Sequence, residues 1–193
     1  MKDHVPTRGL SEINHHDNSI DKTRIINQYQ LYDMSYENKM KVIEEFEQKV
    51  LKYDYESAIV IDTKGYVYEL EGNARDVSIT ILDDDILKGS MVSHNHPIDD
   101  TSYSFSIFDI ETFLDKEIDT LRGIDEMFNY EINRTKDTLK LDSYLKSIHK
   151  SYENQARLLP HFSPELDFSV DLDVYDYINK NLSDIYQFLY KRW

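Results

Sequence analysis

The spacing of apolar residues changes along the chain from a helical to a strand pattern, and this change most constrains the fold. From Ser35 to about Lys52, apolar side chains recur every three to four residues, while Lys and Glu fill the other face. This spacing predicts an amphipathic helix. Residues 58–61 and 66–70 are short apolar runs joined by the turn residues 62–65, which predicts a β-hairpin. The chain must therefore pack helices against a sheet.

Further strands and helices are expected along the chain. The pattern predicts strands over residues 77–82 and 91–96, with Pro97 ending the second one, and another strand within residues 124–134. Helices are expected over about 107–119, 138–158 and 172–192. This order favours an α+β or mixed α/β class, with layers of helices on a sheet and extra helices at the C-terminal end.

The length suits one main domain with appended segments. The 193 residues are 40% hydrophobic and 12% aromatic, which is enough for a sizeable core. Residues 1–30 are polar and are expected to form an irregular arm, residues 31–158 the main domain, and residues 159–193 a helical extension packed on it. No secretory signal or membrane-spanning run is found, so a cytoplasmic location is expected.

Charge and cysteine content exclude several classes of function. Lys and Arg number 22 against 37 Asp and Glu, for a net charge of −15, so neither nucleic acid nor an anionic membrane is an expected partner. The absence of cysteine removes disulfides, thiolate zinc fingers and cysteine nucleophiles. Any metal site must therefore use histidines and carboxylates.

The most specific chemical signal surrounds His94 and His96. Side chains alternate along a strand, so both imidazoles project to the same side, next to the loop that begins at Pro97. Asp109, in the first turn of the next predicted helix, is well placed to supply a third ligand. Two histidines, one carboxylate and a water form a typical catalytic zinc set.

Simpler explanations exist for each part of this pattern. A single His-x-His is common and usually marks exposed or hydrogen-bonded histidines. Ser106 and Asp109 have the spacing of a capping box that opens a helix. A cap is compatible with a metal site, because it fixes the start of the helix and so directs the ligand.

The sequence His94-Asn95-His96-Pro97, followed by Phe105-Ser106-x-x-Asp109, resembles the JAMM motif of the JAB/MPN metalloprotease family, in the form typical of bacterial and phage members. The resemblance covers about residues 53–134. The spacer of residues 97–105 is two residues longer than the usual one. A register starting at Ser104 would place Ile107 at the ligand position, and isoleucine cannot bind a metal. The resemblance implies a cytidine-deaminase-like JAB/MPN fold with a central mixed β-sheet flanked by helices.

The family also carries a glutamate upstream of the histidines. The candidates are Glu56, Glu69 and Glu71. Glu56 is favoured, because it directly precedes a predicted strand and follows the first helix, where family members carry this residue. Glu69 and Glu71 lie at the end of the hairpin and are expected to face solvent.

The resemblance implies an activity and a role for each residue. Zn²⁺ would be held by His94, His96 and Asp109 and would activate a water molecule. Glu56 would act as general base and then as general acid, and Ser106 would donate a hydrogen bond to the oxyanion. The expected function is that of a zinc-dependent metallopeptidase or isopeptidase, with a peptide or a protein carrying a ubiquitin-like tail as substrate.

Two other functions are considered. A non-catalytic module of the same fold would use its acidic surface and C-terminal helices to bind a protein partner. A metal-dependent nuclease is disfavoured by the charge of −15. Other residues are expected in minor roles: His15 and His16 at the surface, His149 and His161 in structural positions, and backbone carbonyls, Asp99 or Asp100 as hydrogen-bond partners of the metal-binding imidazoles.

Overall fold

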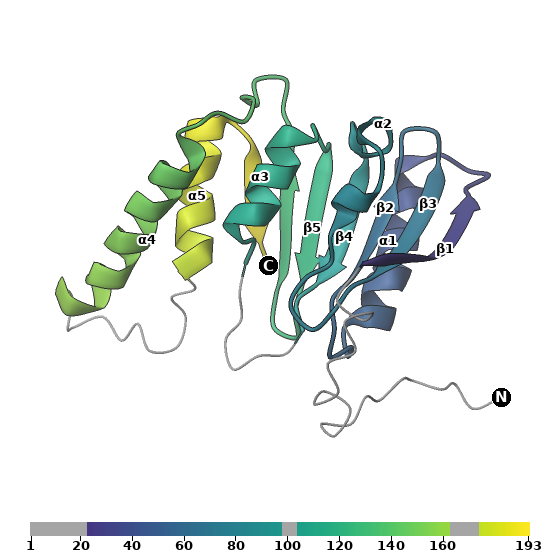
Figure 1. Ribbon diagram of the computed structural model, residues 1–193, viewed down its shortest axis with the longest axis horizontal. Helices are drawn as coiled ribbons and strands as arrows, with labels where there is room; N and C mark the ends of the chain where they lie inside the picture. Colours follow the sequence, from purple (N-terminus) through teal and green to yellow (C-terminus); the bar gives the residue numbers. More distant parts are fainter. Residues whose placement is uncertain (1–22, 98–103, 163–173) are drawn as a thin grey trace.

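A seven-stranded mixed β-sheet forms the centre of the molecule (Figure 1). This computed structural model describes residues 23–97, 104–162 and 174–193. The strand order is β1-β3-β2-β4-β5-β6-β7, in which β4 and β5 are parallel and the other neighbours antiparallel. The strands are β1 (Arg24–Gln30), β2 (Ser57–Ile61), β3 (Tyr66–Glu71), β4 (Met91–Asn95), β5 (Thr120–Ile124), β6 (Asn129–Asn133) and β7 (Leu189–Arg192).

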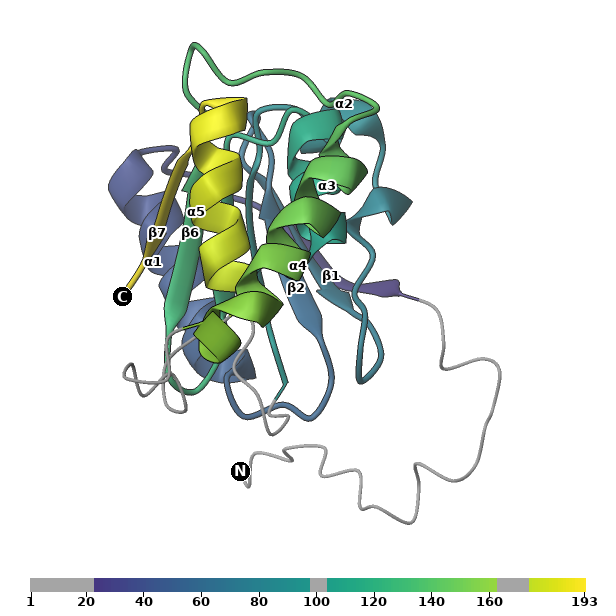
Figure 2. The same cartoon turned by 90° about the vertical axis from the view of Figure 1, so that its left-hand side faces the viewer.

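Helices cover both faces of the sheet, which confirms the mixed α/β class. They are α1 (Tyr36–Val50), α2 (Asp84–Leu87), α3 (Ile107–Asp115), α4 (Leu145–Phe162) and α5 (Val174–Tyr186). Helix α1 packs on one face, and α3, α4 and α5 lie over the other (Figures 1 and 2). Among the described residues, no helix combines the length and apolar character that crossing a membrane requires.

The two faces of the sheet carry separate cores. Ile59 and Ile61 of β2 pack towards α1, whereas Ala58 and Val60 pack under α3 and α5. All four side chains are buried because strand residues alternate between two covered faces. This explains why β2 appears in the sequence as a continuous apolar run.

Helix α3 connects the two parallel strands. A parallel connection must return the chain to the starting end of the sheet, so α3 runs antiparallel to β4 and β5. The N-terminus of α3 therefore lies at the carboxyl end of β4. Ligand sites of open α/β sheets occur at this end of the strands.

Several predicted elements are confirmed. Ser35 caps α1, its side chain accepting a hydrogen bond from the Asn38 N–H, and the helix ends at Val50. The hairpin of β2 and β3 and the strand before Pro97 also lie where the sequence placed them. Predicted helix 107–119 ends early, at Asp115, and predicted helix 138–158 begins late, at Leu145.

The predicted strand over residues 77–82 is wrong. Ile79–Ile81 forms a turn of 3₁₀ helix, and α2 follows it. Ile79 and Leu82 are buried three residues apart, whereas Ile81 is exposed. Burial therefore follows a helical spacing, and the β-branched residues alone suggested a strand.

The ends of the chain contribute more to the sheet than the sequence indicated. Residues 24–30, assigned to the irregular arm, form edge strand β1, which pairs with β3. The predicted helix 172–192 ends at Tyr186, and Gln187, with a φ of 58°, leads into β7. The helix expected to end at residue 158 continues to Phe162 as α4.

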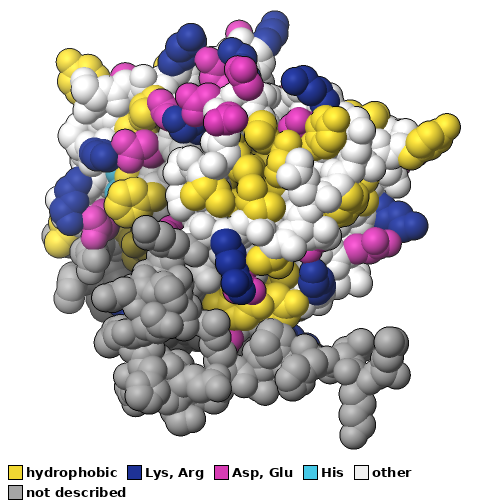
Figure 3. Space-filling model, turned by 45° about the vertical axis from the view of Figure 1, so that its right-hand side comes forward, with side chains coloured by type: hydrophobic (Ala, Val, Ile, Leu, Met, Phe, Trp, Pro, Cys, Tyr) yellow, Lys and Arg dark blue, Asp and Glu magenta, His cyan; other side chains and the backbone are white. Residues whose placement is uncertain are grey.

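Strand β1 is the edge strand on one side of the sheet, and no other strand within the described ranges pairs with its outer side. Ile25, Ile26 and Tyr29 are all exposed on it. In Figure 3, which brings the β1 side of the molecule forward, apolar side chains gather near the middle of the face with charged side chains around them.

Strand β5 was missed by the sequence analysis because its apolar run is interrupted by Arg122 and Gly123. Arg122 is 5% exposed and forms a bidentate ion pair with Glu47 of α1, with N–O distances of 2.7 and 3.0 Å. It also donates to Glu131 of β6, and the Ser93 hydroxyl of β4 donates to Glu47 at 2.7 Å. This network connects α1 to β4, β5 and β6.

Replacing Arg122 by Ala should lower the free energy of unfolding by about 3–5 kcal/mol. The change leaves Glu47 buried without its cation and removes one of the two cations paired with Glu131, which keeps Lys191 and the amide of Asn133. Urea unfolding followed by circular dichroism measures the loss. The control is Arg24→Ala, which removes the exposed ion pair with Glu71 and should cost about 0–1 kcal/mol. Equal losses in the two variants would contradict this account.

Candidate functional site

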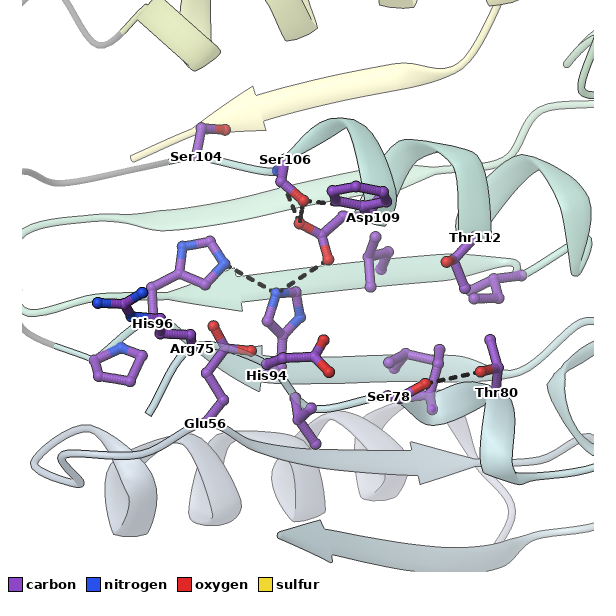
Figure 4. A pocket seen from close by; sticks show the side chains of 18 of the residues that line it. Glu56, Arg75, Ser78, Thr80, His94, His96, Ser104, Ser106, Asp109 and Thr112 are labelled. Carbon is purple, nitrogen blue, oxygen red and sulfur yellow. Dashed lines mark hydrogen bonds and ion pairs between the residues drawn. The ribbon is translucent and has the colours of Figure 1, made fainter. Parts of the chain in front are cut away.

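Three potential metal ligands meet at the carboxyl end of β4 (Figure 4). The Nε2 atoms of His94 and His96 lie 2.9 Å apart, and Oδ1 of Asp109 lies 3.5 Å from His94 Nε2. One ligand atom from each residue lies within 4.8 Å of the other two. Around a tetrahedral zinc ion, ligand atoms are about 3.3 Å apart. The group could therefore hold a metal ion, as the sequence predicted.

His94 is held in the protonation state that a metal requires. Burial, the largest cause, and the nearby His96 together lower the pKa of His94 to about 4, against the opposing effects of Asp109 and a hydrogen bond to the backbone of Arg122. The ring is therefore neutral at physiological pH, and the neutral imidazole is the form that binds metals. The backbone of Arg122 supplies the kind of support expected for the ring, while Asp99 and Asp100 lie outside the described residues.

A capping box directs Asp109 towards the histidines. Ser106 is the N-cap of α3, and its hydroxyl accepts from the Asp109 N–H at 3.3 Å. Oδ2 of Asp109 accepts from both the backbone N–H and the hydroxyl of Ser106, each at 2.7 Å. Oδ1 is left facing His94. The cap and the ligand role of Asp109 therefore occur together.

Glu56 lines the same hollow as the three ligands. Burial, the largest cause, and the negative charges of Asp109 and Asp76 together raise the pKa of Glu56 to about 8. A hydrogen bond from the backbone of Val77 acts in the opposite direction. A carboxyl group in this environment is perturbed in the way that is common at functional sites.

The other two glutamates lie outside the hollow. Glu69 is buried and pairs with Lys49 of α1 at 2.7 Å, whereas it was expected to face solvent. Glu71 pairs with Arg24 of β1 at 2.7 Å. Both carboxylates are thus engaged on β3, and Glu56 is the candidate that the fold brings to the ligands.

The hollow has a volume of about 620 Å³ and extends from the ligands between residues 74–80 and α3. Figure 4 shows Ser78 and Thr80 on one side of it and Thr112 on the other. His94, His96, Asp109 and Glu56 lie together at one end. The arrangement leaves space for a substrate beside the potential metal ligands.

Gly123 of β5 makes room for the rings at the site. It lies opposite His94 in the register of β4 and β5. A Cβ at this position would be 3.0 Å from the Phe105 ring and 3.5 Å from the His96 ring. The glycine within an otherwise extended segment was the available signal, because an isolated glycine in a strand marks a close approach.

Asn179 of α5 holds the segment that leads into α3. Its side chain is fully buried and donates to the Phe105 carbonyl at 2.9 Å and to the Ser104 hydroxyl at 3.1 Å. The Ser104 hydroxyl also lies 2.8 Å from the Tyr190 hydroxyl of β7. No sequence pattern indicates these contacts, because they join residues more than 70 positions apart.

Of the other histidines, only His149 has a described side chain, and it does not line the hollow. His149 of α4 is buried with its ring 6.2 Å from that of Tyr175, in the structural position that was expected. His15, His16 and the side chain of His161 lie outside the described residues.

The purified protein should bind about one equivalent of zinc, measured by elemental mass spectrometry after dialysis. His94→Ala and Asp109→Ala should lose the metal, because each removes one of three protein ligands. His149→Ala is the matched control and should keep it. A wild-type protein that takes up no zinc would refute the metal site.

Asn179→Ala should weaken zinc binding about 10-fold or more, because residues that orient ligands contribute in this range. The comparison is Leu182→Ala, which truncates another fully buried side chain of α5 without touching the segment before Ser106. Competition titration with a zinc chelator measures both affinities. If the two variants bind zinc equally well, Asn179 serves only the stability of the fold.

Comparisons with known proteins were made by family, by sequence and by structure. No protein-family model, no curated protein and no solved structure matches the chain. The potential metal site is therefore defined by the geometry of its own residues.

Proposed function

We propose that the chain is a zinc-dependent metallopeptidase of the JAB/MPN type that hydrolyses a peptide or isopeptide bond. One observation carries the proposal: Glu56, the two histidines, Ser106 and Asp109 come from separate segments and line one hollow. Each of them has the chemistry that its place in the JAMM pattern requires. The same resemblance supports a cytidine-deaminase-like arrangement of the sheet.

The ligand set suits zinc. Two imidazole nitrogens and one carboxylate oxygen form a typical catalytic zinc set and leave a position open for water or substrate. When bound, zinc would polarise the scissile carbonyl and increase the acidity of water. The chain has no cysteine that could offer a competing thiolate site.

Glu56 moves the proton in this proposal. Its carboxylate accepts a proton from the attacking water and delivers it to the leaving amine. The Val77 N–H binds this carboxyl group and restricts its orientation. A cation held by the neighbouring ligands would favour the ionised form, because an opposite charge offsets the effect of burial.

Ser106 stabilises the oxyanion in this proposal. Its hydroxyl points to Oδ2 of Asp109, which also accepts the Ser106 backbone N–H. If the hydroxyl turns towards the substrate, the backbone hydrogen bond keeps Asp109 in place. One such donor contributes about 3 kcal/mol to the transition state.

The alternative is a non-catalytic module that binds a protein partner. Burying Glu56 close to Asp109 costs free energy, and a module that only binds a partner has no use for this arrangement. The net charge of −15 continues to disfavour a nuclease. These observations favour hydrolysis of an amide bond in a protein or peptide.

The test compares wild type with Glu56→Gln, both loaded with zinc, on a linear peptide and on an isopeptide-linked ubiquitin-like protein. Wild type should cleave at least one of them, and Glu56→Gln should reduce kcat by about 10²–10⁴-fold while keeping the metal, because the amide cannot accept the proton. Mass spectrometry of the products gives the rate and the bond.

The matched control is Glu71→Gln, which alters a carboxylate on the neighbouring β3 outside the hollow and should retain wild-type activity. Equal cleavage by wild type and Glu56→Gln would remove Glu56 from its role. Failure of zinc-loaded wild type on both substrates would favour the binding module.

A further inference from the structure

Asn95 lies between the two histidines in sequence, but its side chain serves the neighbouring strand. It is 1% exposed. Its Oδ1 accepts from the Ser57 N–H at 2.7 Å, and its Nδ2 donates to the Tyr55 carbonyl at 3.0 Å. These two backbone groups stand on either side of Glu56.

The contacts of Asn95 extend the pairing of β2 with β4. The last pair in the register of these strands is Ala58 with His94. One residue further, the amide of Asn95 takes the place of a backbone partner. It holds the chain at Glu56 after the ladder itself has ended.

The backbone of Glu56 is fixed on its other side as well. Its N–H donates to the Asn73 carbonyl at 2.7 Å, and its carbonyl accepts from the Gly72 N–H at 2.9 Å. A Cβ on Gly72 would lie 2.2 Å from the Asp76 carbonyl oxygen, so this turn packs tightly. Asn95 thus completes a set of hydrogen bonds that holds residues 55–57 from both neighbouring segments.

Only a side-chain amide of this size can both accept from the Ser57 N–H and donate to the Tyr55 carbonyl. It combines an acceptor for the Ser57 N–H with a donor for the Tyr55 carbonyl. Aspartate would offer the carbonyl no donor, and an apolar residue would leave the buried Ser57 N–H unpaired.

We infer that Asn95 is a positioning residue that sets the location of Glu56 relative to the metal ligands. Residues 94–96, at the end of β4, then contain both the two histidines and the residue that positions Glu56. A shift of the histidines along the sheet carries Glu56 with them. The inference rests on the proposed function for the role of Glu56, but the placement of Glu56 can be tested without activity.

The kinetic test uses Asn95→Ala in the zinc-loaded protein. We expect kcat to fall about 10²-fold, the loss that a small misplacement of a reacting group produces, with KM and zinc content unchanged. In a Glu56→Gln background the same substitution should cause no further loss, because Asn95 acts through Glu56. The control is Ser93→Ala, which removes a buried hydrogen bond of β4 on the α1 side and should leave kcat unchanged.

The second readout is hydrogen exchange of the Ser57 amide in the metal-free protein, measured by NMR. Asn95→Ala should accelerate this exchange at least 10-fold, whereas Ser93→Ala should not. If Asn95→Ala does not fold, Asn95→Asp serves instead, because it keeps the shape of the side chain but cannot donate to Tyr55. For that variant the readout is a crystal structure in which the Glu56 carboxyl should move away from the histidines.

The outcomes distinguish failure of the positioning role of Asn95 from failure of the proposed peptidase function. Unchanged exchange at Ser57, an unmoved Glu56, or a loss of kcat that multiplies with that of Glu56→Gln would each overturn the role of Asn95. If zinc-loaded wild type cleaves no substrate, the proposed function fails, while exchange and the position of Glu56 still decide whether Asn95 holds it.

Discussion

The parallel pairing of β4 and β5 is the constraint on which the site depends. Because the two strands are parallel, the connecting helix α3 must run back along the sheet, and its first turn comes to lie over the end of β4. His94 and His96 end one element, and Ser106 and Asp109 begin the next. The capping box and the metal ligands are therefore brought together by the direction of one connection.

Burial of polar groups on both faces of the same strands supports this arrangement. Arg122 and its carboxylate partners lie on the α1 face, while the histidines, Asp109 and Glu56 lie on the other. Buried charges are costly unless they are paired, and here hydrogen bonds from several elements satisfy them. Arg122 connects the strands that carry the site to α1 and β6. Asn179 connects the segment before α3 to the C-terminal helix α5.

The site combines potential metal ligands with residues that contact the segments carrying them. Three side chains present potential ligand atoms close to one another, and Glu56 lines the same hollow from the position just before β2. Asn95, Gly123 and Asn179 supply no potential ligand atom, but Asn95 and Asn179 hydrogen-bond to the backbone beside Glu56 and Ser106, and Gly123 leaves room for the Phe105 and His96 rings. Such residues escape motif analysis, because their function is visible only in their contacts.

The sequence alone determined the local elements and the chemistry of the site. Periodicity predicted α1, the hairpin and β4, and the spacing of His94, His96, Ser106 and Asp109 pointed to a potential ligand set, because alternation on a strand and capping of a helix depend on near neighbours. The tertiary structure decided the rest. Strands β1, β5 and β7 exist because other strands pair with them. The position of Glu56 in the sequence favoured it over Glu69 and Glu71, but only the fold brings Glu56 to the hollow and pairs the other two with Lys49 and Arg24. These outcomes depend on contacts between residues far apart in the chain, and such contacts leave no periodic pattern in the sequence.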